Sequence, residues 1–174
     1  LGDVGTGKST IVEKLTGATR GSSASFESVT ITSEVYEIYD GSLIICDTPS
    51  SNAQWDRFSH NLHIANAMNF HSVTCMMIVV KADTRIDNVL ESVRKYAESF
   101  LSEDLPYDLL SVCVTHMDQV HWTSGDFLEN LNRELGMNTA VFCSLSASQE
   151  SLRAGMMQEL LAKKQRPVTL QIDS

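Results

Sequence analysis

The chain has 174 residues, about the length of one domain and enough to bury a single hydrophobic core. Hydrophobic residues make up 43% and charged residues 20%, and no stretch approaches about 18 consecutive apolar residues, so we expect a globular protein without a membrane span. The formal net charge of −9 argues against a nucleic-acid partner, because phosphate backbones are bound by clustered lysine and arginine side chains.

A glycine-rich loop at residues 2–9 matches G-x-x-x-x-G-K-[ST] at every fixed position. Such a loop turns backbone N–H groups towards phosphate oxygens, and glycine permits both the curvature and the close approach. Lys8 is expected to reach the β and γ phosphates, where its charge serves catalysis, and the Ser9 hydroxyl is expected to ligate Mg²⁺. The candidate nucleotide-binding residues of the loop are Gly5, Thr6, Gly7, Lys8, Ser9 and Thr10. The loop therefore predicts binding of a nucleoside triphosphate.

The segments around this loop predict a helix and a hairpin. Only Leu1 precedes the loop, so we expect the strand that normally leads into it to lie upstream or to be truncated. A helix over 8–16 should follow, and a small, polar stretch over 18–28 predicts a mobile loop. Strands over 29–39 and 42–46 then flank Asp40-Gly41, a strong signal for a two-residue antiparallel hairpin.

The rest of the chain alternates between strands and helices. The expected elements are a helix over 60–70, a strand over 73–81, a helix over 86–101, a strand over 109–115, a helix over 126–135, a strand over 139–143 and a helix over 148–164. This order predicts a three-layer α/β domain with a mostly parallel sheet and one antiparallel edge strand from the hairpin. The short basic cluster at 163–166 is explained by cations near a helix C-terminus, and 165–174 is expected to be a tail.

Polar residues follow the predicted strands, where ligands bind in open α/β sheets. Asp47 comes after the strand over 42–46, and a carboxylate there can bind Mg²⁺ directly or through water. Thr115, His116 and Asp118 come after the strand over 109–115, and Asp118 can accept hydrogen bonds from the ring N–H and the exocyclic amine of guanine. After the last strand, the small residues Ser146 and Ala147 let a backbone N–H approach a base oxygen.

The four cysteines, Cys46, Cys75, Cys113 and Cys143, are far apart and lack C-x-x-C spacing. Each falls in an apolar stretch that we interpret as a strand, so we expect reduced, buried thiols. Reduced thiols favour a cytosolic or nuclear compartment, and our prediction is a cytoplasmic protein.

Taken in order, these segments resemble the motifs of small GTPase-type G domains, which are a G-x-x-x-x-G-K-S loop, a switch threonine, D-x-x-G, [NT]-K-x-D and S-A-[KLS]. Within that superfamily, the segments 7–10, 26–30, 46–49 and 115–118 look most like the immune-associated GTPases of the avirulence-induced type and their chloroplast-import relatives. The resemblance covers nearly the whole chain. It implies a P-loop NTPase fold, with a G domain over residues 1–164.

The resemblance also implies GTP and GDP binding, a Mg²⁺ ion, switch loops that order on the γ-phosphate, and dimerisation across the nucleotide face. Thr30 then matches the switch threonine, with Thr32 as the alternative. By this resemblance Thr30 would join Ser9 and Asp47 at the metal and Lys8 in catalysis. A protein effector is expected, but the sequence does not identify it.

The chain departs from the G-domain pattern at positions that bear on hydrolysis. Ser50 stands where D-x-x-G has glycine, His116 stands where lysine is usual, and no glutamine directly follows Ser50. We therefore expect a guanine-nucleotide switch domain with slow, Mg²⁺-dependent GTP hydrolysis that controls assembly or partner binding. The alternative is a nucleotide-binding interaction module without useful turnover.

Overall fold

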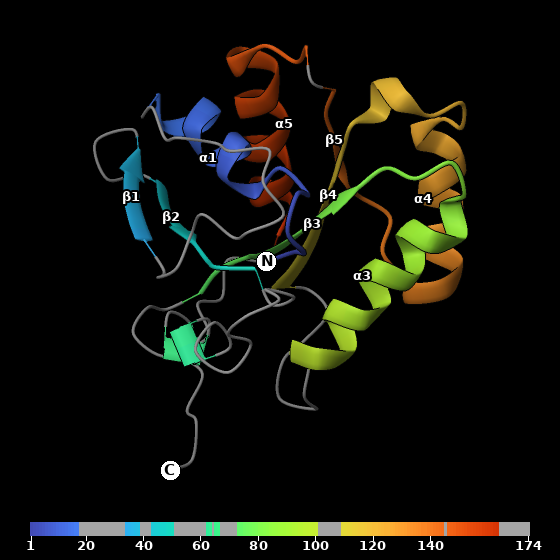
Figure 1. Ribbon diagram of the computed structural model, residues 1–174, viewed down its shortest axis with the longest axis horizontal. Helices are drawn as coiled ribbons and strands as arrows, with labels where there is room; N and C mark the ends of the chain where they lie inside the picture. Colours follow the sequence, from blue (N-terminus) through green and yellow to red (C-terminus); the bar gives the residue numbers. More distant parts are fainter. Residues whose placement is uncertain are drawn as a thin grey trace. The chain divides into compact units, whose positions relative to one another are not determined.

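The computed structural model describes residues 1–17, 34–38, 43–50, 62–63, 65–66, 73–100, 109–144 and 146–163 (Figure 1). The chain divides into two compact units, residues 1–74 with 166–174, and residues 75–165, which we describe separately. The predicted helix over 60–70 lies mostly outside the described residues, and so does the tail over 165–174. No helix in the described ranges combines the length and apolar character that crossing a membrane requires.

The first unit contains α1 (Lys8–Thr16) and the hairpin strands β1 (Glu34–Ile38) and β2 (Leu43–Asp47). The predicted helix over 8–16 is confirmed, and its apolar residues Ile11, Val12 and Leu15 are buried. Its end is set by Gly17, which has φ 75° and donates its N–H to the Glu13 carbonyl at 2.8 Å. The helix contacts both strands of the hairpin.

The two strands pair antiparallel, as predicted, with Glu34 opposite Asp47 and Ile38 opposite Leu43. The predicted turn at Asp40-Gly41 lies outside the described residues. Among the described strands the pair forms a two-stranded sheet of its own, so the expected antiparallel edge on the parallel sheet is not seen. The strand β2 ends at Asp47, directly before residues 48–50. Residues 29–33, predicted as part of the first strand, lie outside the described ranges.

The second unit is built on a parallel sheet in the order β3 (Met76–Lys81), β4 (Leu110–Thr115), β5 (Val141–Phe142). All six residues of β4 are buried, as expected for a central strand covered on both faces. The covering helices are α3 (Ile86–Phe100), α4 (Ser124–Leu135) and α5 (Gln149–Ala162). Figure 1 shows α5 on one side of this sheet and α3 and α4 on the other.

The helix α4 begins two residues earlier than predicted. Thr123 caps it by accepting a hydrogen bond from the Asp126 N–H, and the Asp126 carboxylate accepts from the Thr123 N–H in return. This capping box satisfies N–H groups that would otherwise lack partners, so the helix extends back to Ser124. The strand β5 is shorter than the predicted 139–143.

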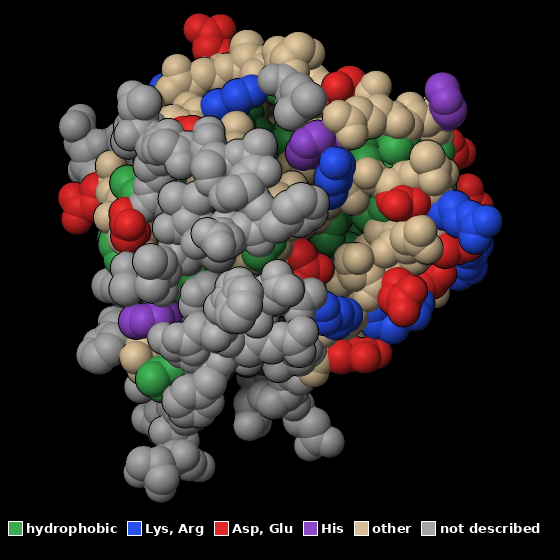
Figure 2. Space-filling model, viewed as in Figure 1, with side chains coloured by type: hydrophobic (Ala, Val, Ile, Leu, Met, Phe, Trp, Pro, Cys, Tyr) green, Lys and Arg blue, Asp and Glu red, His purple; other side chains and the backbone are tan. Residues whose placement is uncertain are grey.

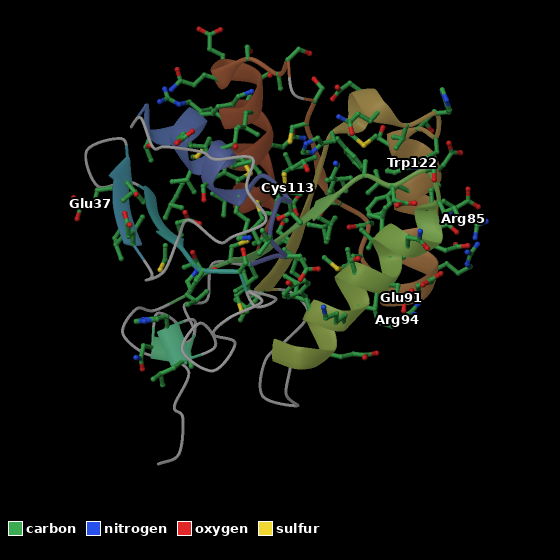
Figure 3. All side chains as sticks on the ribbon, viewed as in Figure 1. Glu37, Arg85, Glu91, Arg94, Cys113 and Trp122 are labelled. Carbon is green, nitrogen blue, oxygen red and sulfur yellow. The ribbon has the colours of Figure 1, made fainter. Side chains whose placement is uncertain are left out.

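All four cysteines are free, as expected for reduced thiols. The expected burial holds only for Cys113, which lies within β4 (Figure 3) and is fully buried. It is wrong for Cys46, Cys75 and Cys143, which are partly exposed. The reason is position, because Cys75 precedes β3, Cys143 follows β5, and Cys46 belongs to the two-stranded hairpin.

Candidate nucleotide-binding site

The glycine-rich loop has the backbone of a phosphate-binding loop. Gly5 and Gly7 have φ 77° and φ 90°, in the left-handed region that glycine adopts without strain. A Cβ added at Gly5 would meet nothing within 4 Å, so the backbone conformation rather than crowding favours glycine there. The Thr6 side chain is buried and its hydroxyl donates to the Asp3 carbonyl at 3.0 Å, which closes the loop on itself.

Lys8 is the buried cation of this loop, with only 8% of its surface exposed. Its ammonium donates to the Gly2 and Asp3 carbonyls and to the Ser50 hydroxyl, each at 2.8 Å. Burial lowers the pKa of Lys8 to about 8, although the charges of Asp47 and Asp3 oppose that shift. An anion at this position would favour the charged form of the ammonium, so Lys8 suits a phosphate.

Ser9 and Asp47 provide oxygen atoms next to Lys8. The Ser9 hydroxyl lies 3.4 Å from Asp47 Oδ2, and Asp47 is buried at the end of β2. Within the described ranges, no cluster of three or more His, Cys, Asp or Glu residues could hold a metal. Mg²⁺ does not require one, because it usually keeps several waters and takes one or two carboxylates plus substrate phosphates. These residues therefore fit a Mg²⁺ ion bound together with a triphosphate.

A buried hydroxyl with no hydrogen-bond partner marks the same segment. Thr48 is 8% exposed, and its Oγ1 is one of two buried side-chain oxygens without a partner among the described residues. Buried polar atoms are normally satisfied by protein, water or ligand. The segment 47–50 thus contributes a metal-type carboxylate, an unsatisfied hydroxyl and the Ser50 contact to Lys8.

The predicted base-binding residues lie together in the second unit, at the carboxyl ends of β4 and β5. His116 has φ 59° and leads into the short helix η2 (Met117–Gln119), which exposes Asp118. The Met117 N–H donates to the Cys143 carbonyl at 3.2 Å, which joins the loop after β4 to the loop after β5. The structure therefore brings Asp118 close in the fold to the segment that precedes Ser146.

Thr115 positions the His116 ring. The Thr115 hydroxyl lies 3.3 Å from the Val80 carbonyl of β3, to which it donates, and 2.8 Å from His116 Nδ1. Burial lowers the pKa of His116, the positive charge of Lys81 lowers it further, and the negative charge of Asp118 raises it. The imidazole is therefore mainly neutral at neutral pH and can present an uncharged ring to a base.

The segment after β5, which contains the predicted base-binding residues Ser146 and Ala147, forms a turn. The Ala147 N–H donates to the Ser144 carbonyl at 3.1 Å, and the Ser144 and Ser146 hydroxyls are 3.1 Å apart. Ser146 is exposed and Ala147 is half-buried. The turn leads directly into the N-cap of α5, where the Ser148 hydroxyl accepts from the Ser151 N–H.

The structure groups the predicted site residues into two sets. The phosphate set lies in the first unit and comprises Gly5, Thr6, Gly7, Lys8, Ser9 and Asp47. The base set lies in the second unit and comprises Thr115, His116, Asp118, Ser146 and Ala147. Thr10 is exposed in the first turn of α1. Thr30 and its alternative Thr32 lie outside the described residues, so their predicted roles remain predictions. Sequence reasoning noted Ser50 only as a departure from D-x-x-G and did not predict its contact with Lys8.

Comparisons with known proteins bear on the family and the fold of the chain. A family model described as 50S ribosome-binding GTPase matches residues 1–113. A search of curated protein sequences found no match. A solved structure described as "Dimerization is important for the GTPase activity of chloroplast translocon components atToc33 and psToc159" is similar with a TM-score of 0.67 and 14% identity, over 98% of this chain and 84% of that chain.

A second solved structure, an NFeoB variant of S. thermophilus bound to GDP.AlF4-, has a TM-score of 0.62 and 13% identity, over 97% of this chain and 63% of that chain. At these identities the likeness shows the fold alone, which is the α/β fold of P-loop GTPases. The family model spans more than half of the 174 residues. The chain therefore belongs to this family of GTP-binding G domains.

Proposed function

We propose that this chain is a guanine-nucleotide switch domain that hydrolyses GTP slowly with Mg²⁺, and that its nucleotide state controls assembly or binding of a protein partner. The observation that carries the proposal is the buried Lys8 ammonium, held at 2.8 Å by two loop carbonyls and the Ser50 hydroxyl. A desolvated ammonium favours an anionic ligand, because a negative charge beside it offsets the burial that lowers its pKa.

The phosphate set supports binding of the triphosphate end. Lys8 would neutralise charge on the β and γ phosphates, and the N–H groups at the start of α1 would bind phosphate oxygens. Ser9 and Asp47 would hold Mg²⁺ directly or through water, and a bound Mg²⁺ supplies further neutralisation of the phosphates. Thr30 is proposed as a third ligand of the metal. Its position is outside the described residues.

The base set supports guanine over adenine. Asp118 is exposed on η2, where a base can reach its carboxylate, and the Met117–Cys143 hydrogen bond fixes the backbone on which it stands. A carboxylate there pairs with two donors of guanine that adenine does not present together. Ser146 and Ala147 would complete the base pocket after β5.

The rival function is a nucleotide-binding module without useful turnover. It is favoured by the absence of a glutamine directly after Ser50, since no residue there plainly orients an attacking water. The structure related to atToc33 and psToc159 is described as linking dimerisation to GTPase activity in those proteins. We propose by analogy that a second copy across the nucleotide face completes this site.

The remaining partner predictions follow from charge. Acidic and basic side chains are interspersed over α3 and α4 on the face shown in Figure 2, and the described residues on that face form no continuous basic patch. Together with the net charge of −9, this supports a protein partner rather than a nucleic acid. A cytoplasmic location stays a prediction.

The test is a calorimetric titration of the full chain with GTP and Mg²⁺, for the wild type and for Lys8→Ala. We expect Lys8→Ala to abolish binding while circular dichroism shows a folded protein. Lys95→Ala, an exposed lysine of α3, is the matched control and should bind as the wild type does. Unchanged affinity in Lys8→Ala would remove the phosphate-binding assignment.

A further inference from the structure

We propose that the Ser50 side chain determines the preference of this site for GTP over GDP, by donating a hydrogen bond to the γ-phosphate beside Lys8. The inference rests on the proposed function and adds a specificity residue to it. In the usual D-x-x-G motif this position has no side chain, so a hydroxyl here is a property of this chain.

The contact that carries the inference joins two segments distant in sequence. Ser50 Oγ lies 2.8 Å from Lys8 Nζ, and Ser50 is only 5% exposed. Three residues earlier, Asp47 Oδ2 lies 3.4 Å from the Ser9 hydroxyl. The segment 47–50 is therefore held against both Lys8 and Ser9, which are the residues expected to meet the terminal phosphate and its metal.

The geometry of an ammonium limits where a phosphate can bind. Lys8 has three N–H donors, so a phosphate oxygen that replaces one loop carbonyl lies within about 5 Å of Ser50 Oγ. The other oxygens of the same phosphate group are then within reach of the Ser50 hydroxyl. Because a hydroxyl can accept one hydrogen bond and donate another, Ser50 can bridge Lys8 and the phosphate.

The terminal phosphate is the one that Ser50 should contact. The main chain of a glycine-rich loop encloses the α and β phosphates, and the lysine reaches the β and γ phosphates. Gly2 and Asp3, whose carbonyls also hold Lys8, belong to that loop, whereas Ser50 follows β2. A contact from outside the loop favours the γ-phosphate, so it is made with GTP and lost with GDP.

A different role for the same contact makes the opposite prediction. If Ser50 only held Lys8 in the ligand-free loop, it would compete equally with GTP and GDP for the ammonium. Removing the hydroxyl would then change both affinities by the same factor. The ratio of the two affinities separates these roles, and a purely structural effect would not move it.

The experiment measures the affinities of GTP and GDP, each with Mg²⁺, by calorimetry of the full chain. For Ser50→Ala we expect the GTP affinity to fall about tenfold or more, as for loss of a hydrogen bond to a charged acceptor, with GDP unchanged. Ser92→Ala, which removes a hydroxyl on α3, is the matched control and should leave both affinities unchanged.

Ser50→Cys keeps nearly the same volume with a weaker donor, so it should lower the ratio of GTP to GDP affinity even if Ser50→Ala does not fold. The inference would be overturned by a folded variant whose ratio of GTP to GDP affinity is unchanged, because both affinities stay the same or change by the same factor. That outcome would leave the proposed function standing. A wild type that binds neither nucleotide would refute the proposed function itself.

Discussion

At the scale of single residues, Asp118 and His116 share one short loop but depend on different surroundings. Asp118 is exposed on η2. His116 is partly buried and linked to the Thr115 hydroxyl, which in turn lies against the Val80 carbonyl. One side chain is thus available to a base, whereas the other is held in place by the sheet. Their substitutions should have separable effects.

We predict that Asp118 selects the base. Two charge-assisted hydrogen bonds of about 1.5–3 kcal/mol each correspond to a preference for GTP over ATP of roughly a hundredfold or more, which Asp118→Ala should abolish. Asp118→Asn should shift the preference towards xanthosine triphosphate, because the new amide can donate to its ring carbonyl. Competitive binding with the three nucleotides measures this, with the exposed Asp87→Ala as control. Equal binding of ATP and GTP by the wild type would contradict it.

The lowered pKa of His116 makes a prediction about stability and pH. Below the ordinary value of 6.5, the unfolded chain takes up the His116 proton more readily than the folded protein. Protonation of His116 therefore lowers the free energy of unfolding as the pH falls below about 6.5. Below the folded-state pKa both states carry the proton, so this group lowers the free energy of unfolding no further.

The measurement is urea unfolding at pH 7.5 and pH 5.5 for the wild type and His116→Asn. Asparagine tolerates the left-handed backbone at this position but does not titrate there. The variant should lose less stability than the wild type between the two pH values. An equal or greater loss would show that the imidazole is not responsible.

At the scale of elements, α5 is attached to the parallel sheet by a buried carboxylate. Glu159 is 5% exposed, and its Oε1 accepts from the Ser111 hydroxyl of β4 at 2.5 Å and from the Thr139 hydroxyl at 2.9 Å. Lys163 pairs with the same oxygen at 3.4 Å and also donates to the Leu110 carbonyl. Lys163 therefore lies at the C-terminal end of α5, where its sequence position predicted a cation.

We predict that Glu159→Ala destabilises the protein by about 3 kcal/mol or more, because breaking a buried pair leaves the partner charge and hydroxyls unsatisfied. Chemical denaturation measures the change. The control is Glu150→Ala, in the exposed first turn of α5, which should cost far less. A small effect at Glu159 would show that water replaces its contacts.

The helices α3 and α4 and the loops that precede them are joined by polar contacts at the surface and by an aromatic contact with the core. Arg94 of α3 pairs with Glu134 of α4, and the Trp122 indole donates to the Asp83 carbonyl at 2.7 Å (Figure 3). The Trp122 ring also stacks on the buried Phe127 of α4. These contacts connect the loop after β3 with the segment between η2 and α4.

At the scale of the whole molecule, the proposed hydrolysis of GTP requires a group that positions the attacking water. Under the proposed function, Lys8 and the residues proposed to hold Mg²⁺ would neutralise charge, but no described residue plainly positions a water. Residues 51–61, which include Arg57 and His60, lie outside the described ranges, and so does Arg20. These three side chains are candidates for reaching across from a second copy.

We predict slow turnover by the monomer, on the order of 10⁻⁴ to 10⁻² per second, as in G domains without a supplied arginine or with one built in. If a second copy completes the site, GTP turnover per molecule should rise with protein concentration. Arg57→Ala and His60→Ala, compared with the wild type over a wide concentration range, test which side chain is responsible. Fast turnover at high dilution contradicts the prediction, and a uniformly slow rate favours the module without turnover.

The sequence by itself determined the glycine-rich loop, the order of the described helices and strands and the family resemblance. These depend on local patterns, such as the loop at 2–9, the apolar stripe of α1 and the continuous hydrophobic stretch of β4. Local patterns can be interpreted from spacing alone, because side-chain periodicity follows directly from backbone geometry. The ends of elements were less predictable, as Thr123 at the start of α4 illustrates.

Only the tertiary structure decided which side chains meet. The contact of Ser50 with Lys8 and those of Glu159 with Ser111 and Thr139 join residues far apart in the chain. No spacing rule predicts such pairs, because they depend on how β2 ends beside α1 and how α5 packs on its sheet. The same packing buries Lys8 and lowers its pKa, since desolvation is a property of the folded surroundings.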